Sequence, residues 1–107
     1  MGQGGAGPVR TGQAGEAWVR ARYDIGDKTK IFVNGRGRIP DGITPTTVSE
    51  VKNVKTLSYT QQLRDYVEYA RQTGRTFDLY VRRDTIPSKP LLRAVDRREL
   101  RLLPVIP

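Results

Sequence analysis

The sequence predicts an α/β (α+β) fold in which a small mixed sheet is flanked by helices. Three observations predict it: apolar residues recur at helical spacing in two segments, they alternate in several short segments, and an Asn-Gly pair separates two of these. The expected order is helix, three strands, helix, strand, then a short helix and a last strand. With 107 residues, the chain supports one small domain.

The first half of the chain is expected to form one helix and three strands. Residues 1–12 are rich in Gly and indicate a flexible linker, so the folded domain is expected over residues 13–107. A helix is expected from Gln13 to about Tyr23, with Thr11 as its N-cap. Its apolar stripe consists of Ala14, Ala17, Trp18, Ala21 and Ile25. The three strands, with Asn34-Gly35 as the turn of the first hairpin, are Lys30–Val33, Arg36–Ile43 and Thr47–Val54.

The second half is expected to begin with a helix that Thr60 caps and Gly74 ends. The buried stripe of this helix consists of Leu63, Tyr66, Val67 and Ala70. A strand follows over Thr76–Arg83, and its inward residues are Phe77, Leu79 and Val81. Pro at a first helical position predicts a short helix, and the chain is expected to end in a strand; these are Pro90–Val95 and Leu100–Ile106.

Composition narrows the function. The net charge is +8 and Arg dominates over Lys, which favours a polyanionic partner and nucleic acid above all. The absence of Cys and His excludes disulfides, zinc sites of the usual kind and His-based nuclease mechanisms. No apolar run is long enough to span a membrane, and no signal-peptide pattern opens the chain, so no membrane partner is expected.

The residues that carry chemistry are Asp41, Glu50 and Lys52. Period-2 geometry puts Glu50 and Lys52 on one face of a strand and points Val51 into the core. Two carboxylates suit a hard divalent cation, and an amine can activate water or neutralise developing charge, as phosphodiester hydrolysis requires. A turn role is the alternative for Asp41, and a solvated edge strand is the alternative for Glu50 and Lys52. The second alternative is the weaker, because this strand is expected to be central in its sheet.

The order of elements, with Asp41 late in one strand and Glu50-x-Lys52 in the next, resembles the PD-(D/E)XK (restriction-endonuclease-like) nuclease superfamily. Gln62-x-x-x-Tyr66 in the following helix resembles the motif of its RecB-like branch. Glu16 matches an acidic residue that many members carry on the first core helix. The resemblance implies a restriction-endonuclease-like core and a metal-dependent nuclease. It implies that Asp41, Glu50 and Glu16 hold Mg²⁺ or Mn²⁺ and that Gln62 assists Lys52.

Further strings resemble a group of bacterial polymorphic-toxin nuclease domains, which form the C-terminal tips of large secreted proteins. These strings are RIPDG, SEVKNVK, Thr60-x-Gln62-Leu63, and LYVR followed by Ser88-x-Pro90-Leu91. The resemblance runs from about Gly15 to Ile106. It implies delivery as part of a larger effector into the cytoplasm of a target cell, DNA as substrate, and an immunity protein, which should be acidic because the toxin is basic.

For several residues, two alternative roles remain open. Glu16 either holds a metal or complements a helix dipole, and Gln62 is either part of the site or an ordinary polar residue of an early helical turn. Tyr66 either reaches nucleic acid or packs in the core. Contacts with the phosphate backbone are expected from Lys55, Arg82 and Arg38.

Two other functions remain open. One is a housekeeping repair or junction-resolving nuclease of the same fold, and the other is a basic domain that binds nucleic acid without catalysis. Cleavage of RNA by the same fold is a further alternative, because no recognisable feature of the sequence indicates whether 2′-hydroxyl groups are recognised.

Overall fold

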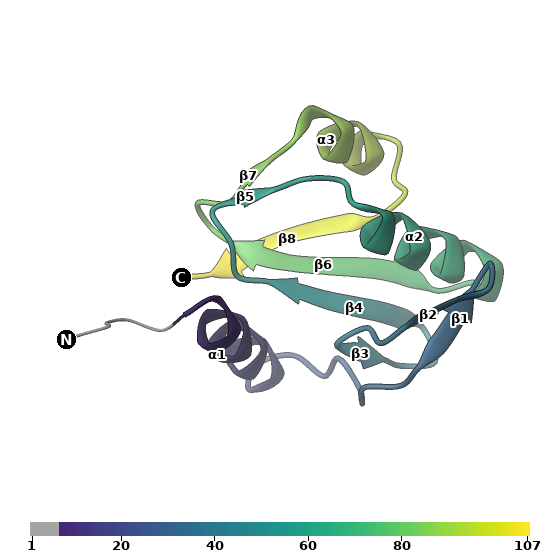
Figure 1. Ribbon diagram of the computed structural model, residues 1–107, viewed down its shortest axis with the longest axis horizontal. Helices are drawn as coiled ribbons and strands as arrows, with labels where there is room; N and C mark the ends of the chain where they lie inside the picture. Colours follow the sequence, from purple (N-terminus) through teal and green to yellow (C-terminus); the bar gives the residue numbers. More distant parts are fainter. Residues whose placement is uncertain (1–6) are drawn as a thin grey trace.

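The computed structural model describes residues 7–107, and its main element is a four-stranded mixed sheet (Figure 1). Its strands are β3 (Gly42–Ile43), β4 (Thr47–Lys52), β6 (Thr76–Arg82) and β8 (Arg101–Ile106), in the order β3-β4-β6-β8. β3 is antiparallel to β4, whereas β4, β6 and β8 are parallel. The strand with Glu50 and Lys52 is therefore internal, as predicted.

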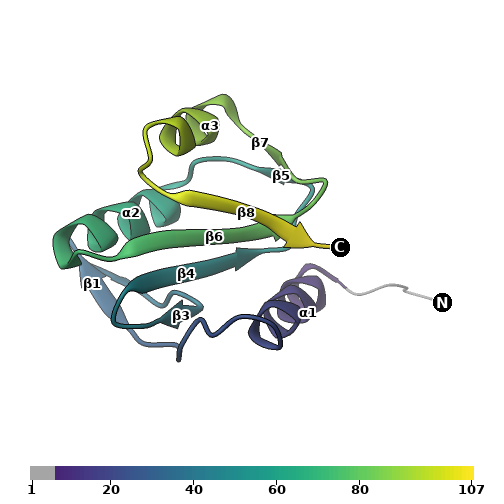
Figure 2. The ribbon, with the colours of Figure 1, turned by 180° about the vertical axis from the view of Figure 1, so that it is seen from behind.

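Three helices cover the sheet, with α1 (Pro8–Arg20) on one face and α2 (Gln61–Thr73) and α3 (Lys89–Asp96) on the other (Figures 1 and 2). Parallel strands need helical crossovers, which α2 and α3 supply. The α+β architecture that the sequence predicted, a small mixed sheet flanked by helices, is confirmed. Within residues 7–107, no helix is long and apolar enough to cross a membrane.

Alternation along β6 builds a core on each face of the sheet. Toward α2, the side chains of Phe77, Leu79 and Val81 pack with Leu63 and Tyr66. The other face packs against α1, and its buried residues are Val19, Ile25, Val51, Tyr80 and Ile106. Val51 thus points into the core on the side opposite Glu50, as the strand period predicts.

Local signals place α2 where it was predicted. The Oγ1 atom of Thr60 accepts a hydrogen bond of 3.3 Å from the Leu63 amide and so caps the first turn. Gly74 ends the helix in the left-handed region, at φ 70°.

The hairpin of β1 (Ile31–Val33) and β2 (Arg36–Arg38) also follows the prediction. Asn34 and Gly35 have φ values of 50° and 80°, which is the pattern of a type I′ turn.

The start of α1 differs from the prediction. The helix begins at Pro8, with Gly7 as its N-cap, so Thr11 lies inside it and residues 8–12 are not a linker. The sequence pattern missed this start because Pro at a first helical position needs no side-chain cap. The first six residues of the predicted linker lie outside the described residues.

The buried face of α1 was predicted correctly only in part. Ile25 is buried and Trp18 packs against the core, as predicted. Ala14, Ala17 and Ala21 are exposed, and Gly15 and Val19 are buried instead. A Cβ on Gly15 would lie 2.6 Å from the Cβ of Asn53, so the missing side chain allows the helix to approach the end of β4 closely.

The single strand predicted over Arg36–Ile43 is two strands in different sheets. β2 pairs with β1, β3 pairs with β4, and Ile39, Pro40 and Asp41 form the crossing between them. Pro40 has no amide hydrogen to donate to a ladder. Two short strands, β5 (Thr56–Leu57) and β7 (Ile86–Pro87), form a parallel pair that was not predicted.

Candidate active site

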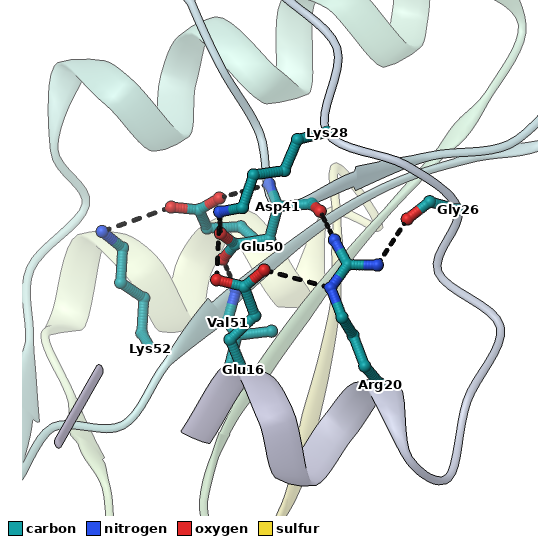
Figure 3. Close-up of polar contacts among 8 residues, drawn as sticks. All are labelled: Glu16, Arg20, Gly26, Lys28, Asp41, Glu50, Val51 and Lys52. Carbon is teal, nitrogen blue, oxygen red and sulfur yellow. Dashed lines mark hydrogen bonds and ion pairs between the residues drawn. The ribbon is translucent and has the colours of Figure 1, made fainter. Parts of the chain in front are cut away.

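The crossing before β3 brings Asp41 to β4. Gly42 pairs with Ser49 in an antiparallel register, which places Asp41 beside Glu50. The three predicted residues Asp41, Glu50 and Lys52 therefore meet at one place on the sheet (Figure 3).

Two hydrogen bonds hold the carboxylates of Asp41 and Glu50 in place. The Asp41 amide donates to Oε1 of Glu50 at 3.1 Å, and the Val51 amide donates to Oδ2 of Asp41 at 2.8 Å. Each carboxylate thus accepts from the main chain of the neighbouring segment. Their separation is set by backbone, which moves less than side chains do.

Lys52 completes the trio from the same strand face as Glu50. Its Nζ lies 3.4 Å from Oε2 of Glu50. The Lys52 side chain is 28% exposed and the Glu50 side chain only 7%. The Glu50 carboxylate is thus buried, and the ammonium group beside it is partly exposed to solvent.

The protonation of Glu50 reflects this burial. Desolvation, followed by the negative charge of Asp41, raises the pKa of Glu50 to about 7, and Lys52 opposes the rise only in part. Burial thus disfavours the ionised form of Glu50 even though the ammonium group of Lys52 lies beside it. A cation bound between the carboxylates would stabilise the ionised form further.

A third carboxylate, that of Glu16 on α1, is linked to Asp41 by the ammonium group of Lys28. Lys28, in the loop after α1, places its Nζ 3.0 Å from Oε1 of Glu16 and 2.9 Å from Oδ1 of Asp41. Burial lowers the pKa of Lys28, but the hydrogen bonds to Asp41 and Glu16 outweigh it and the net direction is upward. Lys28 therefore stays charged in this position.

Arg20 fixes Glu16 and the loop around the site. Its Nε lies 3.1 Å from Oε2 of Glu16, and its guanidinium also donates to the carbonyl oxygens of Gly26, at 2.7 Å, and of Asp41 (Figure 3). One guanidinium thus joins α1 to both segments that carry the site.

The donor set fits a hard divalent cation. Mg²⁺ is commonly held by one or two carboxylates, with waters and substrate phosphate oxygens in its other positions, and Asp41 and Glu50 supply such a pair. Within residues 7–107, no group of three or more His, Cys, Asp or Glu side chains is arranged to hold a metal ion. Lys28 lies between Glu16 and Asp41 and pairs with both carboxylates.

Gln62 and Tyr66 follow the site on α2. Tyr66 is fully buried and packs edge-on against Phe77 at a centroid distance of 5.6 Å. Burial and then the charges of Glu50 and Asp41 raise the pKa of Tyr66. This environment favours the core role of Tyr66 over contact with nucleic acid. Gln62 lies near the Tyr66 hydroxyl, and no hydrogen bond joins it to Lys52 in the described part of the chain.

Two of the basic residues predicted to contact phosphate are already paired. Arg38 donates to buried Asp65 at 2.8 Å, and Arg82 forms two hydrogen bonds of 2.8 Å with Asp84. Lys55 is exposed and has no ion pair among the described residues. Of the three, Lys55 offers the least compensated charge.

The sequence interpretation missed Lys28 and Arg20. The spacing Glu16-x-x-x-Arg20 is a helical ion-pair signal that could have identified Arg20. No local signal marks Lys28, because its partners lie 12 and 13 positions away on other segments.

Comparison with known proteins identifies a family for the chain. The family model described as "Restriction endonuclease fold toxin 7" matches residues 12–91, which include Glu16, Asp41, Glu50 and Lys52. No curated protein and no solved structure matched the chain. The matched range covers most of the chain and indicates a nuclease of the toxin type. The chain belongs to the restriction endonuclease fold toxin 7 family.

Proposed function

We propose that this chain is a metal-dependent endonuclease that hydrolyses phosphodiester bonds in DNA and acts as an antibacterial toxin domain. The observation that carries the proposal is the Asp41–Glu50 pair, which main-chain hydrogen bonds hold beside the partly exposed Lys52. Membership of a toxin family favours this function over a housekeeping nuclease.

The roles of the residues follow from their chemistry. Asp41 and Glu50 would hold Mg²⁺, or Mn²⁺ in its place, and the bound ion would supply Lewis acidity and positive charge at the scissile phosphate. Lys52 would orient the attacking water or offset the charge that develops on the phosphate. Glu16 and Gln62 would lie at the edge of this group of residues, where Glu16 would help to hold the metal and Gln62 would assist Lys52.

The charge of the chain supports a nucleic-acid substrate. A net charge of +8 attracts the phosphate backbone over distances longer than any single contact. Lys55, Arg82 and Arg38 are proposed to contact that backbone, and Tyr66 is the weakest member of the proposed set because it is buried.

The same charge supports an acidic immunity protein as the partner in the producing cell, because complementary charge accelerates association. Delivery as part of a larger secreted effector into a target-cell cytoplasm completes the proposal. Co-expression with the neighbouring reading frame in the producing bacterium tests this part: a true immunity protein restores growth and co-purifies with the chain.

The central experiment is incubation of the purified chain with supercoiled plasmid and, separately, with total RNA, in Mg²⁺ or in EDTA. Asp41→Asn and Lys52→Met are the test variants. Asp96→Asn and Lys89→Met are matched controls, because both residues are exposed on α3. Each control substitution changes the net charge by the same amount as the test variant of the same residue type.

We expect Mg²⁺-dependent nicking of plasmid by the wild type and by both controls, and a loss of at least about 100-fold in each test variant. Cleavage that survives EDTA, or full activity in both test variants, would overturn the proposed mechanism. Cleavage of RNA alone would replace DNA as the substrate and leave the hydrolytic centre in place.

A further inference from the structure

The Lys28 ammonium is already paired with Asp41, one of the two proposed metal ligands. Its Nζ lies within 3.0 Å of carboxylate oxygens from two different elements, Glu16 of α1 and Asp41 of the crossing before β3 (Figure 3). The side chain is about half exposed, at 51%, so it reaches into the site from solvent and is not packed into the core.

The neighbouring bonds leave little room for a second cation at these oxygens. Oδ2 of Asp41 accepts from the Val51 amide and Oε2 of Glu16 is held by Arg20, so Lys28 takes the remaining oxygen of each carboxylate. A divalent ion that binds Asp41 through Oδ1 would have to share or replace the contact with Lys28. Two cations at about 3 Å from one oxygen repel each other strongly in a partly buried site.

We propose that Lys28 occupies the cation position of the metal-free site and is displaced when a divalent metal binds. The inference rests on the proposed metal-dependent function. In the metal-free protein, Lys28 holds Glu16 and Asp41 together against their mutual repulsion. Because Lys28 and the metal compete for Oδ1 of Asp41, the positive charge of Lys28 lowers the affinity of the site for metal. Lys28 is thus a positioning residue that keeps the site assembled before the metal arrives.

The test compares Lys28→Met with the wild type and with Lys30→Met. Lys30 lies two residues away in the same loop, is exposed, and its Nζ lies over the Phe32 ring at 5.3 Å, so its replacement removes the same charge without touching the carboxylates. Binding of Mn²⁺ is measured by electron paramagnetic resonance on the full chain without nucleic acid, which needs no catalysis.

We expect Lys28→Met to bind Mn²⁺ at least about fivefold more tightly than the wild type, the lower end of ordinary coupling between two ligands. Lys30→Met should bind like the wild type. In EDTA, Lys28→Met should melt at a lower temperature than Lys30→Met, and Ca²⁺ should raise its melting temperature more. A structural role alone would lower stability without tightening metal binding.

The outcomes separate this inference from the proposed function. If the wild type binds Mn²⁺ and Lys28→Met binds equally or more weakly, competition by Lys28 is wrong while the metal site stands. If neither protein binds Mn²⁺, the metal site itself is wrong and the inference falls with it.

Discussion

Asp41 and Glu50 are held together by reciprocal main-chain bonds: the Asp41 amide donates to Glu50, and the amide that follows Glu50 donates to Asp41. The carboxylate of Asp41 therefore has a structural task besides any role in catalysis. It satisfies the amide of Val51, a residue that is 7% exposed.

This double task predicts different results for two substitutions of Asp41. Asparagine keeps an oxygen that accepts from the Val51 amide, so Asp41→Asn should lose cleavage and keep most of its stability. Alanine leaves the amide without that partner, so Asp41→Ala should also lose roughly 1–3 kcal/mol. Urea unfolding of the two variants in EDTA checks the difference, and equal stabilities would show that the bond contributes nothing.

The raised pKa of Glu50 predicts an unusual dependence of stability on pH. Burial and the charge of Asp41 raise its pKa from 4.5 in the unfolded chain to about 7 in the folded protein. The folded state therefore binds the proton more tightly, and this contribution to stability falls as pH rises from about 4.5 to about 7. Ionised Glu50 costs the metal-free protein about 3 kcal/mol at most above pH 7, given 1.36 kcal/mol per pKa unit.

Glu50→Gln should remove that cost. In EDTA at pH 8, the variant is expected to be more stable than the wild type, and at pH 4 the two should be close. Guanidinium unfolding at both pH values measures the change. Parallel pH profiles for the two proteins would contradict the prediction, and cleavage should be lost in the variant whatever its stability.

The lowered pKa of Asp65 predicts that stability depends on pH in the opposite direction. It is buried on α2 and accepts hydrogen bonds from Arg36, Arg38 and Gln61, which tie the β1–β2 hairpin to the helix. The hydrogen bond from Arg36, and then those from Arg38 and Gln61, hold the pKa of Asp65 well below its usual range despite burial. Its contribution is therefore full above the unfolded value of about 4 and is lost as pH falls below it.

Asp65→Asn should be less stable than the wild type at pH 7 by roughly 1–3 kcal/mol, because charged hydrogen bonds become neutral ones. The difference should shrink between pH 4 and pH 2. Exposed Asp96→Asn is the matched control and should show neither effect. A difference that is constant from pH 7 to pH 2 would rule out the ion pair as the cause.

The elements that sequence alone predicted correctly are those fixed by neighbouring residues. Asn34-Gly35 determines its turn, and Thr60 and Gly74 determine the ends of α2, because each acts within four positions of itself. The proximity of Asp41, Glu50 and Lys52 could be predicted for a similar reason, since two of the three share a strand.

What sequence alone missed depends on contacts between distant segments. Lys28 gained its place only when α1 and the crossing before β3 came together around it. The same holds for the buried face of α1, where Gly15 is selected by the position of Asn53 and not by helical periodicity. The split of one predicted strand at Pro40 depends on which strand each half finds as a partner.

Tyr66 offers a direct test of its predicted contact with nucleic acid. Its hydroxyl is buried, and although Gln62 lies near it, no hydrogen bond of ordinary geometry joins it to any described residue. Tyr66→Phe removes a polar group whose burial is uncompensated, so the variant should be as stable as the wild type or more stable by about 1 kcal/mol. Unchanged binding of DNA, measured by fluorescence anisotropy in EDTA, would leave Tyr66 a core residue. A loss of binding at unchanged stability would restore its predicted role at the substrate.

Lys55 and Arg82 are predicted to differ in how they bind the phosphate backbone. Lys55 is exposed without an ion pair among the described residues, whereas Arg82 already holds Asp84 through two bonds. Each phosphate contact contributes about 0.9 to the slope of log affinity against log salt on duplex DNA. Lys55→Met should therefore reduce that slope by nearly one, and Arg82→Met by less, because Arg82 must release Asp84 to reach a phosphate.

Anisotropy titrations with the inactive Asp41→Asn chain between low and moderate salt measure both slopes, with Lys89→Met as the control for net charge. Equal reductions for Lys55→Met and Lys89→Met would mean that charge alone, and not position, governs binding.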